Sequence, residues 1–154
     1  MKRWLQFSII LAVSYLLLAC QVSAPGAAFV SPPPPPATSV PPPAAGKATV
    51  VGQVLSLNSR APLANIPVRL AEVYRQGDQA AMVLDGAFSP GDITDDQGQF
   101  VIEDVAPGEY VIIVGDVTAE YEVIAEPPGK ARVWELASDQ VLNAGILQVN
   151  LGSR

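Results

Sequence analysis

Apolar and polar residues alternate with a period of two along most of the chain after residue 46. This period is typical of β-strands, whose successive side chains point to opposite faces of a sheet. The apolar residues that we expect to face a common core are Val50, Gly52, Val54, Ile66, Val68, Leu70, Phe100, Ile102, Tyr110, Ile112, Val114, Leu147, Val149 and Leu151. Turn-forming residues separate these stretches, for example at residues 95–98 and 106–108. Residues 47–154 are therefore predicted to form one all-β domain, a sandwich or a barrel.

The first 19 residues have a different composition, which is typical of an export signal. Lys2 and Arg3 form a short positive segment, and a mostly apolar run over residues 5–18 follows it. This run is too short and too interrupted for a membrane-spanning helix. We predict a cleaved signal peptide, with an uncleaved N-terminal anchor as the alternative. In both cases the rest of the chain lies outside the cytoplasmic membrane.

The run ends in Leu17-Leu18-Ala19-Cys20, which contains the single cysteine of the chain. This tetrapeptide resembles the bacterial lipobox, in which the signal is cut before the cysteine and the thiol is lipidated. The resemblance implies that Cys20 carries several acyl chains, which hold a protein more firmly than one chain does. We therefore expect a lipoprotein whose lipid anchors it to the cell membrane or the outer membrane, with its domain outside the cytoplasm.

Residues 20–46 form a second region, which contains nine of the 15 prolines and no charged residue. Such a stretch cannot build a core and favours an extended polyproline II path. At about 3.1 Å per residue it could reach roughly 80 Å. We predict a semi-rigid tether; a docking segment for a proline-recognising domain and a wall-spanning or glycosylated stalk are the alternatives.

The composition also excludes several kinds of chemistry. The chain has no histidine, and lipidation of Cys20 removes its one thiol. Imidazole bases, Ser-His-Asp triads, disulfides and the commonest zinc ligand are thereby excluded. We predict that the protein is not an enzyme and holds no cofactor. With 15 acidic and nine basic residues it is acidic, so we expect no nucleic-acid partner, because such binding needs basic patches.

Three segments carry a family resemblance. They are Gly-Gln-Val at 52–54 followed by Ala-Pro-Leu-Ala-Asn-Ile-Pro-Val-Arg-Leu at 61–70, Thr-Asp-Asp-Gln-Gly-Gln-Phe-Val-Ile at 94–102, and Val-Ala-Pro-Gly-Glu-Tyr-Val-Ile at 105–112. Together they resemble the carboxypeptidase regulatory-like domain, a prealbumin-like antiparallel β-sandwich of about seven strands related to Cna B-type repeats. The resemblance is good over residues 48–115 and loose over 116–154. It implies a fold but hardly a function, because these residues mark turns and packing.

Exposed aromatic rings could bind sugars by stacking, as in starch-binding modules of similar architecture. The candidate ligand-binding residues are Tyr74, Phe88, Tyr121 and Trp134, with Trp134 and Tyr121 as the pair of main interest. A lone aromatic residue in a strand more often belongs to the core, because it buries a large apolar area. No metal site is predicted; an acidic turn at Asp92, Asp95 and Asp96 leaves calcium binding as an alternative to plain turn chemistry.

Cna B-type relatives can carry a Lys–Asn isopeptide bond, for which the candidates are Lys47, Asn150 and either Glu103 or Glu109. Strand parity argues against this crosslink. Lys47 and Asn150 have the opposite parity to the core residues of their own strands, so both should face outward.

Residues 71–93 are predicted to form a long connection that is unlike the family. Val111 and Ile113 place apolar groups on a sheet face that should be external. One hypothesis is that this connection, or an extra hairpin within it, folds over that face. The alternative is that the face is an exposed patch that recruits a partner. One further ambiguity concerns residues 133–142, whose pattern fits a short helix or a strand.

Taken together, these features predict a non-enzymatic, surface-anchored lipoprotein. The β-sandwich is expected to act as a binding or adaptor module for an envelope protein, presented on the Pro-rich tether. Binding of a carbohydrate or wall polymer is the first alternative, and a passive structural spacer is the second.

Overall fold

The computed structural model describes residues 40–151, so the predicted lipidation site Cys20, with Leu17, Leu18 and Ala19, lies outside the described residues. The described part contains strands and no helix, and therefore no helix that could cross a membrane. The strands are β1 (Ala48–Ser56), β2 (Pro67–Gln76), β3 (Gln79–Val83), β4 (Gly91–Ile93), β5 (Gln99–Val105), β6 (Gly108–Gly115), β7 (Tyr121–Val123), β8 (Ala125–Glu126), β9 (Lys130–Ala131), β10 (Val133–Leu136) and β11 (Val141–Val149). The all-β prediction is confirmed, and within residues 133–142 the structure has β10, a connection over 137–140 and the start of β11.

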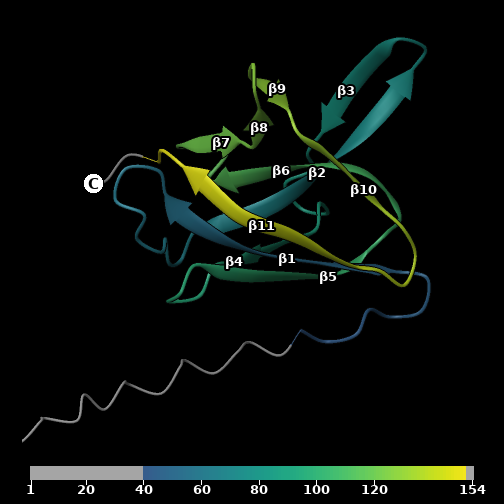
Figure 1. Ribbon diagram of the computed structural model, residues 1–154. Coiled ribbons are helices and arrows are strands. Elements are labelled where there is room, and N and C mark those ends of the chain that lie inside the picture. Colours follow the sequence, from purple (N-terminus) through teal and green to yellow (C-terminus); the bar gives the residue numbers. More distant parts are fainter. Residues whose placement is uncertain (1–39, 152–154) are drawn as a thin grey trace, which may run out of the picture. The chain divides into compact units, whose positions relative to one another are not determined.

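Two main sheets pack face to face as a β-sandwich (Figure 1). Sheet A has the strand order β11-β1-β5. Sheet B has the order β10-β6-β2-β3, with β4 also beside β2 and β7 also beside β6. Strands β8 and β9 form a separate small hairpin. Neighbouring strands are antiparallel except β1 and β11, which run parallel; the chain reaches β11 by crossing from β10 in sheet B to sheet A.

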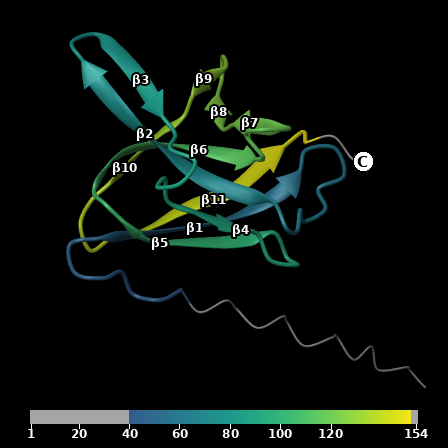
Figure 2. The ribbon, with the colours of Figure 1, turned by 180° about the vertical axis from the view of Figure 1, so that it is seen from behind.

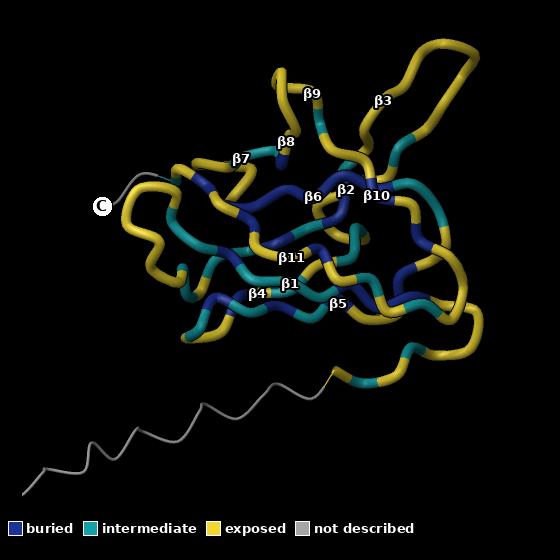
Figure 3. The backbone as a smooth tube through the Cα atoms, in the orientation of Figure 1, coloured by how far each residue is buried: buried dark blue, intermediate teal, exposed yellow. Residues whose placement is uncertain are grey.

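The residues predicted to face inward form the core between the sheets. Val50, Val54, Val68, Leu70, Phe100, Ile102, Tyr110, Ile112, Val114, Leu147 and Val149 are buried, and Ile66 and Leu151 pack against them. Gly52 allows a close approach, because a Cβ at this position would lie 2.7 Å from Cζ of Phe100. The buried stretches of β5 and β6 can be followed in Figure 3.

Residues 71–93 are mostly strand, which corrects the prediction of a long connection. Strand β2 continues through residue 76, turns at Gly77 and Asp78, and returns as β3, which pairs with β2 over residues 79–83. Strand β4 then pairs with the first half of β2. The extra hairpin therefore exists, but it extends sheet B at its edge instead of lying on the outer face of the sheet. It projects from the sandwich in both views (Figures 1 and 2).

A carboxylate connects β4 to β5 at one edge of the sandwich. Asp92 of β4 accepts a hydrogen bond from the backbone N–H of Val101 in β5 at 2.8 Å, and a second from the N–H of Ile93 at 2.8 Å. Since β4 belongs to sheet B and β5 to sheet A, Asp92 links the two sheets and satisfies a backbone donor on the open edge of β5.

Candidate functional site

The outer face of sheet B, which points away from the core, carries apolar side chains from four strands. The register places Val133, Val111 and Ala71 side by side across β10, β6 and β2. It also places Val123 of β7 beside Ile113 of β6. Directly paired residues share a sheet face, so all five side chains lie on this outer face.

Two hollows lie on this face, and we call them together the outer groove. The larger has a volume of about 400 Å³, and its lining includes Val73, Ala80, Met82, Val111, Ala131 and Val133. The smaller has a volume of about 190 Å³, and its lining includes Met82, Leu84, Ile113, Val117, Tyr121 and Val123. Met82 lines both hollows, so the two lie next to each other on this face.

Two hairpins border the larger hollow. The β2–β3 hairpin contributes Val73 and Met82, and the β8–β9 hairpin contributes Ala131. In Figure 1 both hairpins rise from the same side of sheet B. Each is held by its own strand pairing, so the borders of the hollow are regular structure.

The floor of the outer groove is buried while its rim is exposed. Val111 is 1% exposed and Ile113 is 6% exposed, whereas Met82, Tyr121 and Val133 at the rim are exposed. Segment 71–93 therefore covers part of the apolar face, through Met82 and Leu84, and leaves apolar rim atoms in contact with solvent. Apolar rim atoms around a hollow are a common feature of binding surfaces.

Charged groups flank the apolar lining. Arg75 forms an ion pair with Glu109, with 2.6 Å between Nε and Oε2, and Arg75 also lines the larger hollow. Glu126 and Lys130, paired across β8 and β9, line its other side. The ion pair is exposed, so it contributes little to stability. A groove with an apolar floor and mixed charges at its border is suited to non-covalent binding of a partner that is itself apolar and partly charged.

The structure does not bring the predicted aromatic residues together. Trp134 is 6% exposed and packs in the core, which corrects its assignment as a surface sugar platform; the Arg132 guanidinium lies 4.7 Å from its ring centroid. Tyr121 is 51% exposed and lines the outer groove. Phe88 is 85% exposed, in the segment between β3 and β4.

Tyr74 lies on the opposite face of the β2–β3 hairpin from Met82, because its register partner is Ala81. Its hydroxyl donates a hydrogen bond to Glu72 at 2.7 Å, and this bond to a carboxylate raises the pKa of Tyr74 above its ordinary value. Tyr74 and Tyr121 are therefore not a stacking pair.

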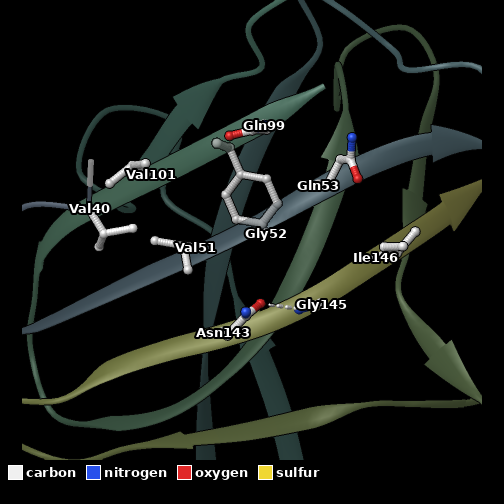
Figure 4. A pocket seen from close by; sticks show the side chains of 10 residues that line it. Val40, Val51, Gly52, Gln53, Gln99, Val101, Asn143, Gly145 and Ile146 are labelled. Carbon is white, nitrogen blue, oxygen red and sulfur yellow. Dashed lines mark hydrogen bonds between the residues drawn. The ribbon is translucent and has the colours of Figure 1, made fainter. Parts of the chain in front are cut away.

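A third hollow, of about 290 Å³, lies on the outer face of sheet A (Figure 4). Its lining combines valines with amides: Val40, Val51 and Val101 lie toward one end, and Gln53 and Gln99 lie toward the other. Several of the amides are occupied by neighbours; for example, Asn143 accepts a hydrogen bond from the N–H of Gly145 at 2.8 Å. The ring of Phe100 also lines this hollow, beside Gly52, but Phe100 is only 2% exposed.

The acidic turn is explained by backbone hydrogen bonds. Oδ1 of Asp95 accepts from the N–H groups of Gln97 and Gln99, both at 2.8 Å. Within residues 40–151, no three Cys, Asp or Glu side chains are grouped closely enough to hold a metal ion. The arrangement of Asp92, Asp95 and Asp96 is that of a turn and a strand link.

The residues considered for an isopeptide bond are far apart. Lys47 precedes β1 and Asn150 follows β11, and these two strands run parallel with Thr49 opposite Val141 and Ser56 opposite Val149. Asn150 lies level with Leu57, ten residues along from Lys47, so the two residues lie at opposite ends of sheet A, about 33 Å apart at the usual rise of a strand. No such bond can form between them in this fold.

No protein-family profile matches the chain, and no curated protein matches it. Solved structures similar to it include a Bacillus cereus major pilin subunit (8% identity, TM-score 0.43, covering 66% of this chain and 29% of the pilin) and a Pseudomonas aeruginosa protein described as a candidate carbohydrate-binding protein (14% identity, TM-score 0.41, covering 68% and 90%). A Cyanothece 9R-lipoxygenase is similar at 18% identity and a TM-score of 0.37, and this chain spans 17% of its length. At these sequence identities and TM-scores, the similarities give no argument for the function of this chain.

Proposed function

We propose that this protein is a non-enzymatic binding or adaptor module that meets an envelope protein through the outer groove. The observation that supports it most is the combination of a buried apolar floor, at Val111 and Ile113, with an exposed apolar rim at Met82, Tyr121 and Val133. The proposal includes lipidation of Cys20, which anchors the chain outside the cytoplasm, and a Pro-rich tether that carries the domain away from the membrane.

The binding role is tested with a variant that lacks the anchor. The chain from residue 21 onward, which lacks both the predicted signal and Cys20, is added to cells, so that any retention comes from a partner. We expect saturable binding that Val133→Glu weakens by about tenfold or more, because a charge at the rim must be desolvated. Ile146→Glu, at a 61% exposed position on sheet A, is the matched control and should bind normally. Equal retention of the two variants would refute the assignment of the surface.

Carbohydrate binding is a second candidate, which the exposed ring of Tyr121 at the smaller hollow favours. Protease treatment of the cells abolishes retention if the partner is a protein, and glycosidase treatment abolishes it if the partner is a polysaccharide. Tyr121→Ala should then weaken retention on the isolated polysaccharide, while Tyr74→Ala should not. If the protein is a passive spacer, we expect no retention on cells, whether untreated or treated with protease or glycosidase.

A further inference from the structure

Strand β3 forms an open edge of sheet B. Within residues 40–151 it pairs only with β2, and no other strand lies along its far side. All five of its residues are exposed. The β2–β3 hairpin projects from the sandwich (Figures 1 and 2), so sheet A does not cover this edge.

The register indicates which backbone groups of β3 are unpaired. A two-residue turn at Gly77 and Asp78 makes Gln76 and Gln79 the closing pair of the hairpin, and hydrogen-bonded pairs alternate from there. Ala80 and Met82 therefore point their N–H and C=O groups away from β2, toward solvent. These are the groups that an added strand would use.

The other sheet edges are short, irregular or already occupied. The N–H of Val101 on the edge of β5 is bonded by Asp92, β10 has four residues, and β11 has a register irregularity opposite Val51 and Gly52. Strand β3, with the sequence Gln-Ala-Ala-Met-Val, has no charge, no proline and no bulge. It lacks the devices by which edge strands usually resist pairing.

The charges beside β3 argue against a second copy of this chain as the occupant. In the antiparallel register that overlaps two β3 strands fully, centred on Ala81, Asp78 of one copy lies opposite Leu84 of the other, one position from Asp85 of that copy. Two carboxylates are therefore brought close together at each end of the pairing, and like charges this near repel each other. The same two carboxylates favour a foreign strand that is basic at its ends.

We propose that β3 is a strand-addition site for an extended segment of a partner protein, with apolar residues at alternate positions and a basic residue at each end. The segment pairs with the outward N–H and C=O groups of Ala80 and Met82, and its apolar side chains continue the surface of the outer groove beside Met82. This inference rests on the proposed binding role and names the kind of partner.

The test uses the full chain and a blocked peptide of alternating valine and threonine with a lysine at each end. We expect the amides of Ala80 and Met82 to exchange with solvent at least about tenfold more slowly when the peptide is bound, while Ala81 and Val83, already paired with β2, stay unchanged. A peptide with glutamate at both ends should bind about tenfold more weakly. Slower amide exchange at every second residue of β3 distinguishes strand addition from docking of the peptide in the outer groove.

Ala80→Pro removes an outward N–H without breaking the β2–β3 pairing, so it should abolish peptide binding and keep the fold. Ala80→Ser, which keeps the N–H, is the matched control. The proposal is overturned if the peptide protects neither Ala80 nor Met82, if it protects only groove residues, or if the chain dimerises through β3 without peptide. Cell retention that survives Ala80→Pro but is lost in Val133→Glu would remove this inference and leave the proposed function standing.

Discussion

Gly52 and Phe100 face each other across β1 and β5, and the missing Cβ of Gly52 is what lets the ring lie there. Gly52→Ala would place a carbon 2.7 Å from Cζ of Phe100, so we expect a loss of about 1–3 kcal/mol in the free energy of unfolding. Gly86→Ala is the control, because nothing lies within 4 Å of its Cβ position. Urea denaturation of both variants checks this, and equal midpoints would contradict it.

Trp134 is a core residue, and Tyr121 is a surface residue. Trp134→Ala should therefore lower the free energy of unfolding by about 3–5 kcal/mol, as for other large buried aromatics. Tyr121→Ala should change it by less than about 0.5 kcal/mol. Thermal melts of the two variants measure the difference, and a stable Trp134→Ala protein would show that the indole does not support the core.

Between elements, the Asp92 carboxylate is the link from β4 to β5. Asp92→Ala leaves the N–H of Val101 without its bond, and we expect a loss of about 1–3 kcal/mol. Asp96→Ala, in the adjacent exposed turn, should be nearly neutral. Amide exchange at Val101 gives a local measurement, and unchanged protection in Asp92→Ala would contradict the role of this carboxylate.

The strands inside the sandwich were predictable because their core residues recur every second position. The β2–β3 hairpin was expected only as one possibility within residues 71–93, and its extension of sheet B was not predicted, for a physical reason. Glu72 and Tyr74 occupy positions that should face inward, yet they are exposed because the hairpin projects beyond the core. Val111 and Ile113, which alternate with the core residues of β6, did indicate that the outer face of sheet B is apolar and partly covered. The outer groove itself could not be predicted, since its residues come from strands distant in sequence.

At the scale of the whole molecule, the proposed anchoring depends on a lipid on Cys20. The wild-type protein should partition with the detergent, and its mass should exceed that of the polypeptide cleaved before Cys20 by its acyl chains, whereas Cys20→Ser should carry no acyl mass. Detergent phase partitioning and intact-mass spectrometry measure both. An unmodified thiol at Cys20 would leave the uncleaved anchor as the explanation.

The most direct test of the binding role is photo-crosslinking in the cell, with the reactive residue placed in the anchored chain at Tyr121 or Val133 on sheet B, or at Asn143 or Ile146 on sheet A. We expect one recurrent partner, crosslinked from the two sheet B positions and not from the sheet A positions. The same partner recovered from sheet A alone, or equal yields from both faces, would contradict the claim that the outer groove is the recognition surface.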